Sequence, residues 1–355
     1  MDVEGFDILI LSRPTESRSL YYLTGVDRLC ANLILHKNGK STLLILEQDL
    51  LGADRIDYVD EVLTFNSAKS QFKAIISAIE KKGLKTGIVG IEKSFIHQNF
   101  FESLRAALPL AFQIKDAVNI TGQLRLVKTE GEIQIIKKAS AIATHAMEKA
   151  AEIVEPGIKQ NEIAATVEYE MRRNGAEETA TRTFIASGSG TQAAHSPASN
   201  RQIENGDIVL VDIHPRFKGY SSDLATTFAT PGVQTNLLKA MKLVLESKNA
   251  VIKEFKVGDK VSSIHKNYLD KIKNSELIFP RIPFFNNIHG VGVSANDPPS
   301  FWYPIDIELE PGNLFAYAQS PCLIPQPNFL GVRFEDTYMV TKADIERLTP
   351  FEHRI

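Results

Sequence analysis

The sequence predicts a two-domain protein, with an α/β domain over residues 1–120 and an α+β domain over residues 121–355. Two observations support this fold class. The chain has 355 residues, more than one hydrophobic core of ordinary size needs. Short apolar runs also alternate with helical patterns in the first third of the chain, whereas long helical patterns flank β-like runs in the remainder.

The composition excludes several classes of function. Hydrophobic residues make up 43% and charged residues 23%, as in soluble globular proteins. The net charge of -3 leaves no basic excess to bind nucleic acid. No apolar run approaches the ~20 residues of a membrane span, and the acidic start does not resemble a signal peptide. The only cysteines, Cys30 and Cys322, favour a reducing cytoplasmic location over a disulfide scaffold.

Each element predicted in the first domain has a local signal. Two β-rich runs are joined by Asn38-Gly39, a hairpin sequence in which both residues are expected to accept positive φ. Helical spacing of apolar residues predicts one helix that ends at Gly83 and another that ends before Pro109. The predicted strands are 6–11, 31–36, 41–46 and 87–91, and the predicted helices are 71–82 and 94–108.

A boundary is expected near residues 119–122, and the second domain then opens with helices. Thr129 and Glu132 have the spacing of a capping box, so a long helix should run to about residue 155, where Pro156-Gly157 ends it. The region 279–327 is dense in Pro, Gly, Asn and aromatic residues, which predicts strands and loops. The other predicted elements are helices 162–173, 236–255 and 262–273, and strands 208–213 and 224–229.

Two aspartates are candidates to bind a cation. Asp212 ends an apolar run, and Asp223 follows eleven positions later, after an expected turn at 218–220. Strands that fold back through this turn bring the two carboxylates together, where they repel and lose hydration unless a positive charge compensates. A divalent cation is one such compensation. For the pair alone, the plainer alternative of one turn residue and one strand-edge charge is the stronger.

Three more residues are candidates, each with a structural alternative. His289 lies in the run HGVG at 289–292, where glycines allow a close backbone approach, although such a histidine is commonly a turn residue. Glu335 lies in a strand-like stretch at 331–336, and its alternative is a surface ion pair with Arg333 worth under ~1 kcal/mol. His195, in the run AHSP, is a candidate substrate contact or an exposed loop residue.

In this order, the segments resemble the pita-bread metallopeptidase family, which includes methionine aminopeptidase, prolidase, Xaa-Pro aminopeptidase and the metal-free creatinase. The resemblance covers nearly the whole chain and implies a creatinase/prolidase-type α/β amino-terminal domain before an α+β pita-bread domain. The runs YLTG at 22–25 and LRLVK at 124–128 are similar to the two-domain branch. The remaining motifs are HSP at 195–197, DIH at 212–214, GYSSD at 219–223, HGVG at 289–292 and GVRFED at 331–336.

The resemblance implies a metal-dependent hydrolase of short peptides, of the Xaa-Pro aminopeptidase or Xaa-Pro dipeptidase (prolidase) type, that forms homodimers. In this family two ions share five protein ligands. Carried over by motif, Asp212 holds one ion, His289 holds the other, and Asp223 and Glu335 bridge both. Carboxylates with an imidazole suit Mn, Co, Zn or Fe.

The resemblance also assigns residues to the substrate. His195 and His289 are expected to be catalytic, together with Asn296, which stands where the family has a substrate-facing histidine. The aromatic run FWYP at 301–304 can wall a pocket for a proline ring, or it can serve packing alone.

The sequence departs from the family around the metal site. Ala318 stands where the family has its fifth ligand, a glutamate, and a one-residue bulge would offer the neutral Gln319 instead. His214 stands where the family has glycine, either to replace part of the lost ligand set or to fill the pocket. These departures imply one firmly held ion with a second held weakly, or no ion.

Two alternatives to an active metallopeptidase remain at this point. A metal-free, creatinase-like hydrolase of a small C–N compound is one, although it would not need Asp212, Asp223 and Glu335 together in one pocket. A catalytically silent binding protein on the same fold is the other, favoured by Ala318 and Asn296.

Overall fold

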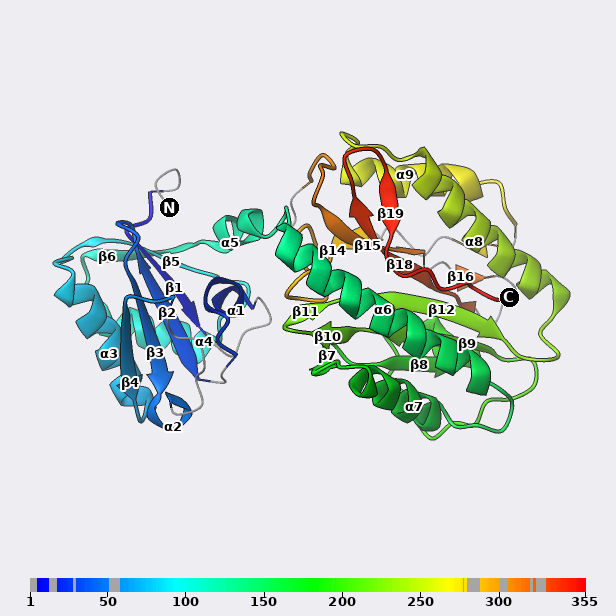
Figure 1. The fold of residues 1–355 in the computed structure, drawn as a ribbon, viewed down its shortest axis with the longest axis horizontal. Coiled ribbons are helices and arrows are strands. Elements are labelled where there is room, and N and C mark those ends of the chain that lie inside the picture. The colour runs from blue at the N-terminus through cyan, green and yellow to red at the C-terminus, as the bar shows by residue number, and fades with distance from the viewer. Residues whose placement is uncertain are drawn as a thin grey trace. The chain divides into compact units, whose positions relative to one another are not determined.

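The computed structural model describes residues 5–12, 18–27, 30–50, 58–193, 195–276, 278–279, 288–300, 306–319, 322–323 and 330–355. The aromatic run at 301–304 lies outside these residues. The chain forms two units, Met1–Leu124 and Arg125–Ile355 (Figure 1). Within the described ranges, no helix is both long and apolar enough to cross a membrane.

A six-stranded mixed sheet, in the order β4-β3-β2-β1-β5-β6, forms the centre of the first unit. The predicted hairpin is confirmed, because β2 and β3 have the predicted bounds and pair antiparallel. Only Gly39 of its turn has positive φ, so the expectation that Asn38 shares this conformation is wrong; Asn38 Oδ1 instead accepts from Lys40 N at 3.0 Å. The strands are β1 (Ile8–Ser12), β2 (Ala31–His36), β3 (Ser41–Leu46), β4 (Glu61–Phe65), β5 (Gly87–Ile91) and β6 (Phe112–Asp116).

Apolar side chains cover both faces of this sheet. Ile8 and Ile10 of β1 belong to the cluster that includes Ile75 of α3, whereas Leu9 belongs to the cluster that includes Leu20 of α1. The alternation of side chains along β1 therefore supplies a core on each face. The helices are α1 (Ser19–Thr24), α2 (Glu47–Leu50), α3 (Ala68–Lys81), α4 (Gln98–Ala107) and α5 (Val118–Leu124), and the last contains the stretch 119–122.

An antiparallel sheet of seven strands forms the centre of the second unit, in the order β14-β15-β18-β12-β9-β8 with β19 paired to β18. The strands β9 and β12 have the predicted bounds. The described part of 279–327 contains strands and loops, as predicted. Strands of the large sheet are β8 (Phe184–Ser187), β9 (Ile208–Ile213), β12 (Leu224–Ala229), β14 (Ile288–Gly290), β15 (Leu314–Gln319), β18 (Phe334–Val340) and β19 (Ile345–Arg347). Two small sheets contain β7 (Glu178–Thr179), β10 (Pro215–Phe217) and β11 (Tyr220–Ser221), and β13 (Ile278–Phe279), β16 (Cys322–Leu323) and β17 (Leu330–Gly331).

The helices of this unit begin and end close to the predicted positions. The capping box is confirmed, because Thr129 Oγ1 accepts from Glu132 N at 3.4 Å while Glu132 Oε2 accepts from Thr129 N at 2.8 Å. The helices are α6 (Glu130–Ile153), α7 (Gln160–Arg173), α8 (Thr235–Glu254) and α9 (Val261–Ile272), with a 3₁₀ turn, η1, at Gly188–Gln192.

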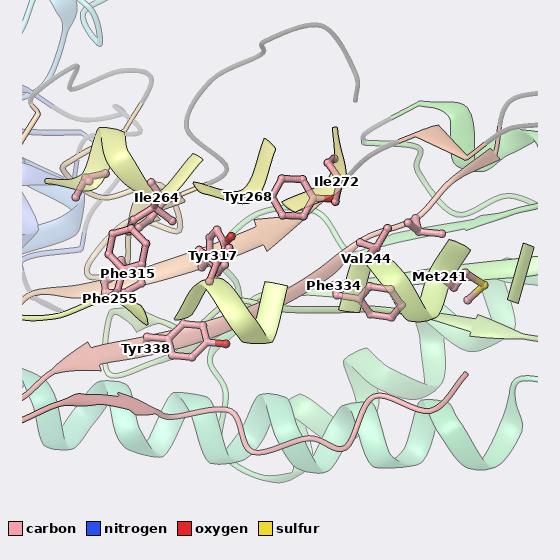
Figure 2. Close-up of a cluster of buried hydrophobic side chains, with 14 of the residues drawn as sticks. Met241, Val244, Phe255, Ile264, Tyr268, Ile272, Phe315, Tyr317, Phe334 and Tyr338 are labelled. Carbon is pink, nitrogen blue, oxygen red and sulfur yellow. The ribbon is translucent and has the colours of Figure 1, made fainter. Parts of the chain in front are cut away.

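Each helix pair packs on its own part of the large sheet. Ile163 and Val167 of α7 share a cluster with Val211 and Ile213 of β9. Helices α8 and α9 share the other cluster with β15 and β18 (Figure 2). The residues of this cluster that Figure 2 labels are Met241, Val244, Phe255, Ile264, Tyr268, Ile272, Phe315, Tyr317, Phe334 and Tyr338.

The packing of α7 also fixes the direction of Asp212. Side chains alternate along a strand, so Asp212, between Val211 and Ile213, faces away from α7.

A buried ionic network ties α8 to β18. Asp336 is fully buried, forms an ion pair with the equally buried Lys248, and accepts from Arg347 Nε at 2.8 Å. His353 Nε2 lies 3.1 Å from the same carboxylate. Burial disfavours the charged form of Asp336, but Lys248 and His353 outweigh it and lower the pKa of this carboxyl. Asp336 is therefore a charged anchor of the core.

Replacing Lys248 should test this anchor. We expect Lys248→Met to lower the free energy of unfolding by about 3 kcal/mol, because it leaves a buried carboxylate without its amine. Chemical denaturation followed by circular dichroism measures the loss. The matched control is Lys242→Met on the same helix, whose side chain is 72% exposed and which should change stability by less than about 0.5 kcal/mol. Equal losses in the two variants would contradict the assignment.

Candidate metal centre

The register of the large sheet places predicted acidic residues in one row. Asp212 on β9 lies opposite Ala225 on β12, which lies opposite Glu335 on β18. The row continues to Ala318 on β15 and, at its other end, to Phe184 on β8. Directly opposed residues of antiparallel strands project from the same face. Strand pairing therefore brings Asp212 and Glu335 to one face of the sheet.

A tight turn adds the second aspartate. Lys218 and Gly219 have φ of 45° and 77°, the positive values typical of a two-residue hairpin turn that matches the strand twist. The turn joins β10 to β11, and Asp223 follows it immediately before β12. The expectation that the chain folds back here and brings Asp212 and Asp223 together is confirmed.

Two sets of three donor groups share Asp223. In the first set, His214 Nε2 lies 3.1 Å from Asp212 Oδ1 and 3.3 Å from Asp223 Oδ1. In the second set, His289 Nε2 lies 3.5 Å from Asp223 Oδ2 and 3.3 Å from Glu335 Oε1. Asp223 thus presents one oxygen to each set, which is how a bridging carboxylate serves two ions.

Two positive groups offset the buried charge of Asp212. Burial opposes ionisation of this carboxyl, but His214 and Arg333 outweigh burial and lower its pKa. Burial likewise opposes the charged form of His214, yet Asp223 and Asp212 raise its pKa well above the usual value.

The second donor set shows the opposite shift for its carboxyl. Burial and then the charge of Asp223 raise the pKa of Glu335. Against the effect of burial, the hydrogen bond to Glu335 and the charge of Asp223 raise the pKa of His289 to about 9. His289 Nδ1 lies 3.1 Å from the carbonyl oxygen of Gly290, which orients the ring so that Nε2 faces the carboxylates.

Arg333 has a different role from the one expected. Arg333 is buried and forms an ion pair with Asp212 Oδ2, and Glu335 is buried as well, so the alternative of a surface ion pair between Arg333 and Glu335 is wrong. Arg333 lies two residues before Glu335 and immediately before the buried strand β18. This position in the sequence was the signal that its side chain could be buried. Arg333 occupies one oxygen of Asp212 and leaves Oδ1 directed to His214.

The glycines beside His289 are required by close approach. A Cβ at Gly290 would lie 2.0 Å from the carbonyl oxygen of Pro298, and one at Gly292 would lie 2.1 Å from Asp297 Oδ2. The expected close backbone approach is confirmed. Asp297 is itself buried and paired with Arg125 and, at 3.3 Å, with Lys128, which fixes the loop after β14.

The two residues predicted to contact the substrate, His195 and Asn296, lie in different surroundings. His195 is exposed, and its ring centroid lies 5.2 Å from that of Phe184, which in turn lies 6.0 Å from that of His214. His195 therefore lies beside one end of the row. Asn296 is exposed in the loop before Asp297, and among the described residues no hydrogen bond or ion pair joins it to the donor sets.

The position of the missing fifth ligand is defined by strand register. Ala318 lies opposite Glu335 and Gln319 opposite Phe334, in regular pairing. The alternative in which a bulge offers Gln319 is therefore wrong, because Gln319 projects from the other face, as Tyr317 does. The second donor set keeps three groups and has a methyl group where a fourth would stand.

The donor groups fit a divalent cation. Asp212 Oδ1 and Asp223 Oδ1 are buried and, among the described residues, have no hydrogen-bond partner. An unsatisfied buried carboxylate oxygen is costly, and a cation shared with imidazole nitrogen would satisfy it. Carboxylates combined with imidazole suit borderline transition metals.

This arrangement, two donor sets that share one aspartate on an antiparallel sheet, is suited to binding divalent ions. Residues 134–342 match metallopeptidase family M24, and residues 1–127 match the creatinase/prolidase amino-terminal domain. The chain belongs to metallopeptidase family M24.

Several known proteins match this chain over its whole length. The chain is 29% identical to the Xaa-Pro dipeptidase of Pyrococcus horikoshii, and the match covers 100% of this chain and 96% of that protein. Among solved structures, the prolidase from P. horikoshii matches with a TM-score of 0.84 and 27% identity, over 100% of this chain and 96% of the other. The prolidase from Pyrococcus furiosus matches with a TM-score of 0.83 and 26% identity, over 99% of both chains.

These matches confirm the pita-bread resemblance and the two-domain fold class. They support metal-dependent peptide hydrolysis and the use of a divalent metal, and they do not favour the metal-free or silent alternatives.

Restoring the absent ligand should strengthen the second donor set. We expect Ala318→Glu to tighten binding of a second Co²⁺ by about 10-fold or more, because a carboxylate would join His289 and Glu335. Isothermal titration of the chelator-stripped protein measures both affinities. Ala318→Gln, of equal size but uncharged, is the control and should leave the second affinity within about 3-fold of the parent. Identical behaviour of the two variants would argue against this position as a ligand site.

Proposed function

We propose that the chain is an Xaa-Pro dipeptidase that cleaves short peptides before proline with the help of one or two divalent ions. The observation that carries this proposal is the pair of donor sets bridged by Asp223, on a fold whose full-length relatives include proteins named Xaa-Pro dipeptidase. Cleavage of longer Xaa-Pro peptides, as by an Xaa-Pro aminopeptidase, is the second candidate, supported by a structural match to an X-Pro aminopeptidase fold.

The metal-binding residues have distinct roles in this proposal. Asp212 would hold an ion at the first site and His289 one at the second, while Asp223 and Glu335 would contribute to both. Bound divalent ions supply Lewis acidity, which lowers the pKa of water and polarises the scissile carbonyl. The protein's part is to hold these carboxylates close together and to keep the imidazole of His289 oriented through Gly290.

The substrate-facing residues are assigned on geometry and motif. His195 lies beside Phe184 at the end of the row, with an exposed ring able to reach a peptide. Partial desolvation and the charge of Arg333 lower the pKa of His195, so at neutral pH its neutral ring can exchange a proton with the substrate. Asn296 can contribute a neutral amide to substrate binding, where a histidine would contribute a proton donor.

We further propose Mn, Co, Zn or Fe as the metal, a homodimer as the assembly and the cytoplasm as the location. The mixed donor set supports the choice of metals, and two cysteines in 355 residues support a reducing compartment. The same proposal divides the chain into an amino-terminal domain, residues 1–120, and a catalytic domain, residues 121–355.

Metal content and hydrolysis of Leu-Pro should be measured on the same preparations. We expect protein re-equilibrated with Mn²⁺, Co²⁺ or Zn²⁺ to retain at least one ion per chain by plasma mass spectrometry and to hydrolyse Leu-Pro. Asp212→Asn should lose that ion and about 10²-fold or more of kcat/KM, because it removes an anionic ligand.

The matched control is Asp270→Asn, a change of the same kind on the exposed surface of α9. It should keep both metal and rate. Leu-Pro and Leu-Pro-Gly tested together separate the dipeptidase from the aminopeptidase candidate. Retention of no ion at micromolar metal, or cleavage that persists after stripping, would overturn the proposed function.

A further inference from the structure

His214 belongs to the first donor set, and its backbone holds it in position. It follows β9 and precedes β10, and its carbonyl oxygen accepts from Ala180 N at 2.7 Å. Its side chain is 6% exposed and directs Nε2 between Asp212 and Asp223. The ring therefore reaches the first donor set from the end of the strand that also carries Asp212.

The distances around Nε2 allow His214 to share an ion with the two aspartates. At metal–donor distances of about 2.0–2.2 Å, neighbouring donors in tetrahedral or octahedral coordination lie about 2.8–3.6 Å apart. His214 Nε2 lies 3.1 Å from Asp212 Oδ1 and 3.3 Å from Asp223 Oδ1, both inside this interval. One ligand atom from each of the three residues lies within 4.8 Å of the others, so the three side chains converge on a position that one ion could share.

The same atoms are not satisfied by hydrogen bonds. Asp212 Oδ1 and Asp223 Oδ1 are buried and have no hydrogen-bond partner within the described part of the chain, although Nε2 is close to both. His214 Nδ1 is likewise without a partner there. A cation held by Nε2 and the two carboxylate oxygens would satisfy these buried atoms together.

We propose that His214 is a metal ligand, and that Asp212, His214 and Asp223 together form the tighter metal site of this protein. The inference rests on the proposed function, since both need a divalent ion at these donor sets. It adds a nitrogen donor to the first site.

This assignment changes the balance between the two donor sets. The second set lacks a fourth protein ligand at Ala318, whereas the first set gains an imidazole. Imidazole favours Co²⁺, Ni²⁺ and Zn²⁺ over Mn²⁺ more than carboxylate does. We therefore expect one tight ion held with nitrogen in its coordination shell and a preference for Co²⁺ over Mn²⁺.

The rival explanation is that His214 is a built-in positive charge that neutralises the aspartates in place of an ion. The two explanations predict opposite effects of His214→Gln. Removing a ligand weakens metal binding, whereas removing a competing charge tightens it or leaves it unchanged. The sign of the change in affinity therefore decides between them.

The first experiment measures Co²⁺ affinity of the full-length, chelator-stripped protein. We expect His214→Gln to raise the Kd of the tight site by about 10-fold or more. The control is His145→Gln on α6, whose side chain is 40% exposed and lies 3.3 Å from Glu170; it should leave the Kd unchanged. An unchanged or lower Kd in His214→Gln overturns the proposal. Thermal unfolding of the stripped proteins checks that each variant is folded.

The second experiment begins with a variant that keeps His214 intact, so its first result does not depend on the folding of His214→Gln. Pulsed electron paramagnetic resonance of bound Mn²⁺ detects coordinated imidazole nitrogen. We expect His289→Gln to retain a Mn²⁺ ion with nitrogen coupling, and the double variant His214→Gln/His289→Gln to lose that coupling. Loss of all Mn²⁺ in His289→Gln, or bound Mn²⁺ without nitrogen coupling, overturns the proposal.

Failure of this inference can be distinguished from failure of the proposed function. If the parent protein binds metal and cleaves Leu-Pro only when loaded, while His214→Gln binds Co²⁺ normally, the function stands and His214 is not a ligand. If the parent binds metal through His214 but leaves Leu-Pro intact, the ligand assignment stands and the proposed substrate is wrong.

Discussion

Mutual repulsion among three buried carboxylates, those of Asp212, Asp223 and Glu335, is the constraint on which the second unit depends. Burial removes the hydration of these groups, so each needs a positive or hydrogen-donating neighbour at short range. The guanidinium of Arg333 and the imidazoles of His214 and His289 are these neighbours, and they come from different segments of the chain. Helices α6 to α9 supply the apolar packing that keeps these elements in register. The polar face is thus stable only because the large sheet has a well-packed hydrophobic core.

Two other buried carboxylates in the same unit, those of Asp336 and Asp297, have their charge neutralised by protein side chains alone. Asp336 is surrounded by Lys248, Arg347 and His353, and Asp297 is paired with Arg125 and Lys128. Both oxygens of Asp336 accept hydrogen bonds. Asp212 and Asp223, by contrast, each keep one buried oxygen without a hydrogen bond among the described residues. That contrast, rather than burial itself, separates the candidate ligands from the carboxylates that only hold the fold together.

Local signals in the sequence predicted the elements well, because capping, turn chemistry and apolar runs act over a few residues. The bounds of β9 and β12 and the capping box at Thr129 follow from such signals. Strand register depends on pairing between distant segments and was not predictable in this way. Because of the register, Gln319 and Glu335 project from opposite faces of the sheet. Pairing of the distant strands also places Arg333 beside Asp212 and not at the surface. The family motifs identified the acidic residues, but only the geometry showed how close His214 comes to two of them.

The row that crosses β8, β9, β12, β18 and β15 also couples metal binding to folding. Its acidic members come from segments far apart in sequence, so the unfolded chain cannot present them to an ion together. An ion that binds only the native sheet stabilises it in proportion to the logarithm of its concentration above Kd. The melting temperature of this protein should therefore report the free metal level of its surroundings. In a cell poor in the metal, the same linkage would leave more of the chain open to proteolysis, so the supply of the ion would regulate abundance as well as rate.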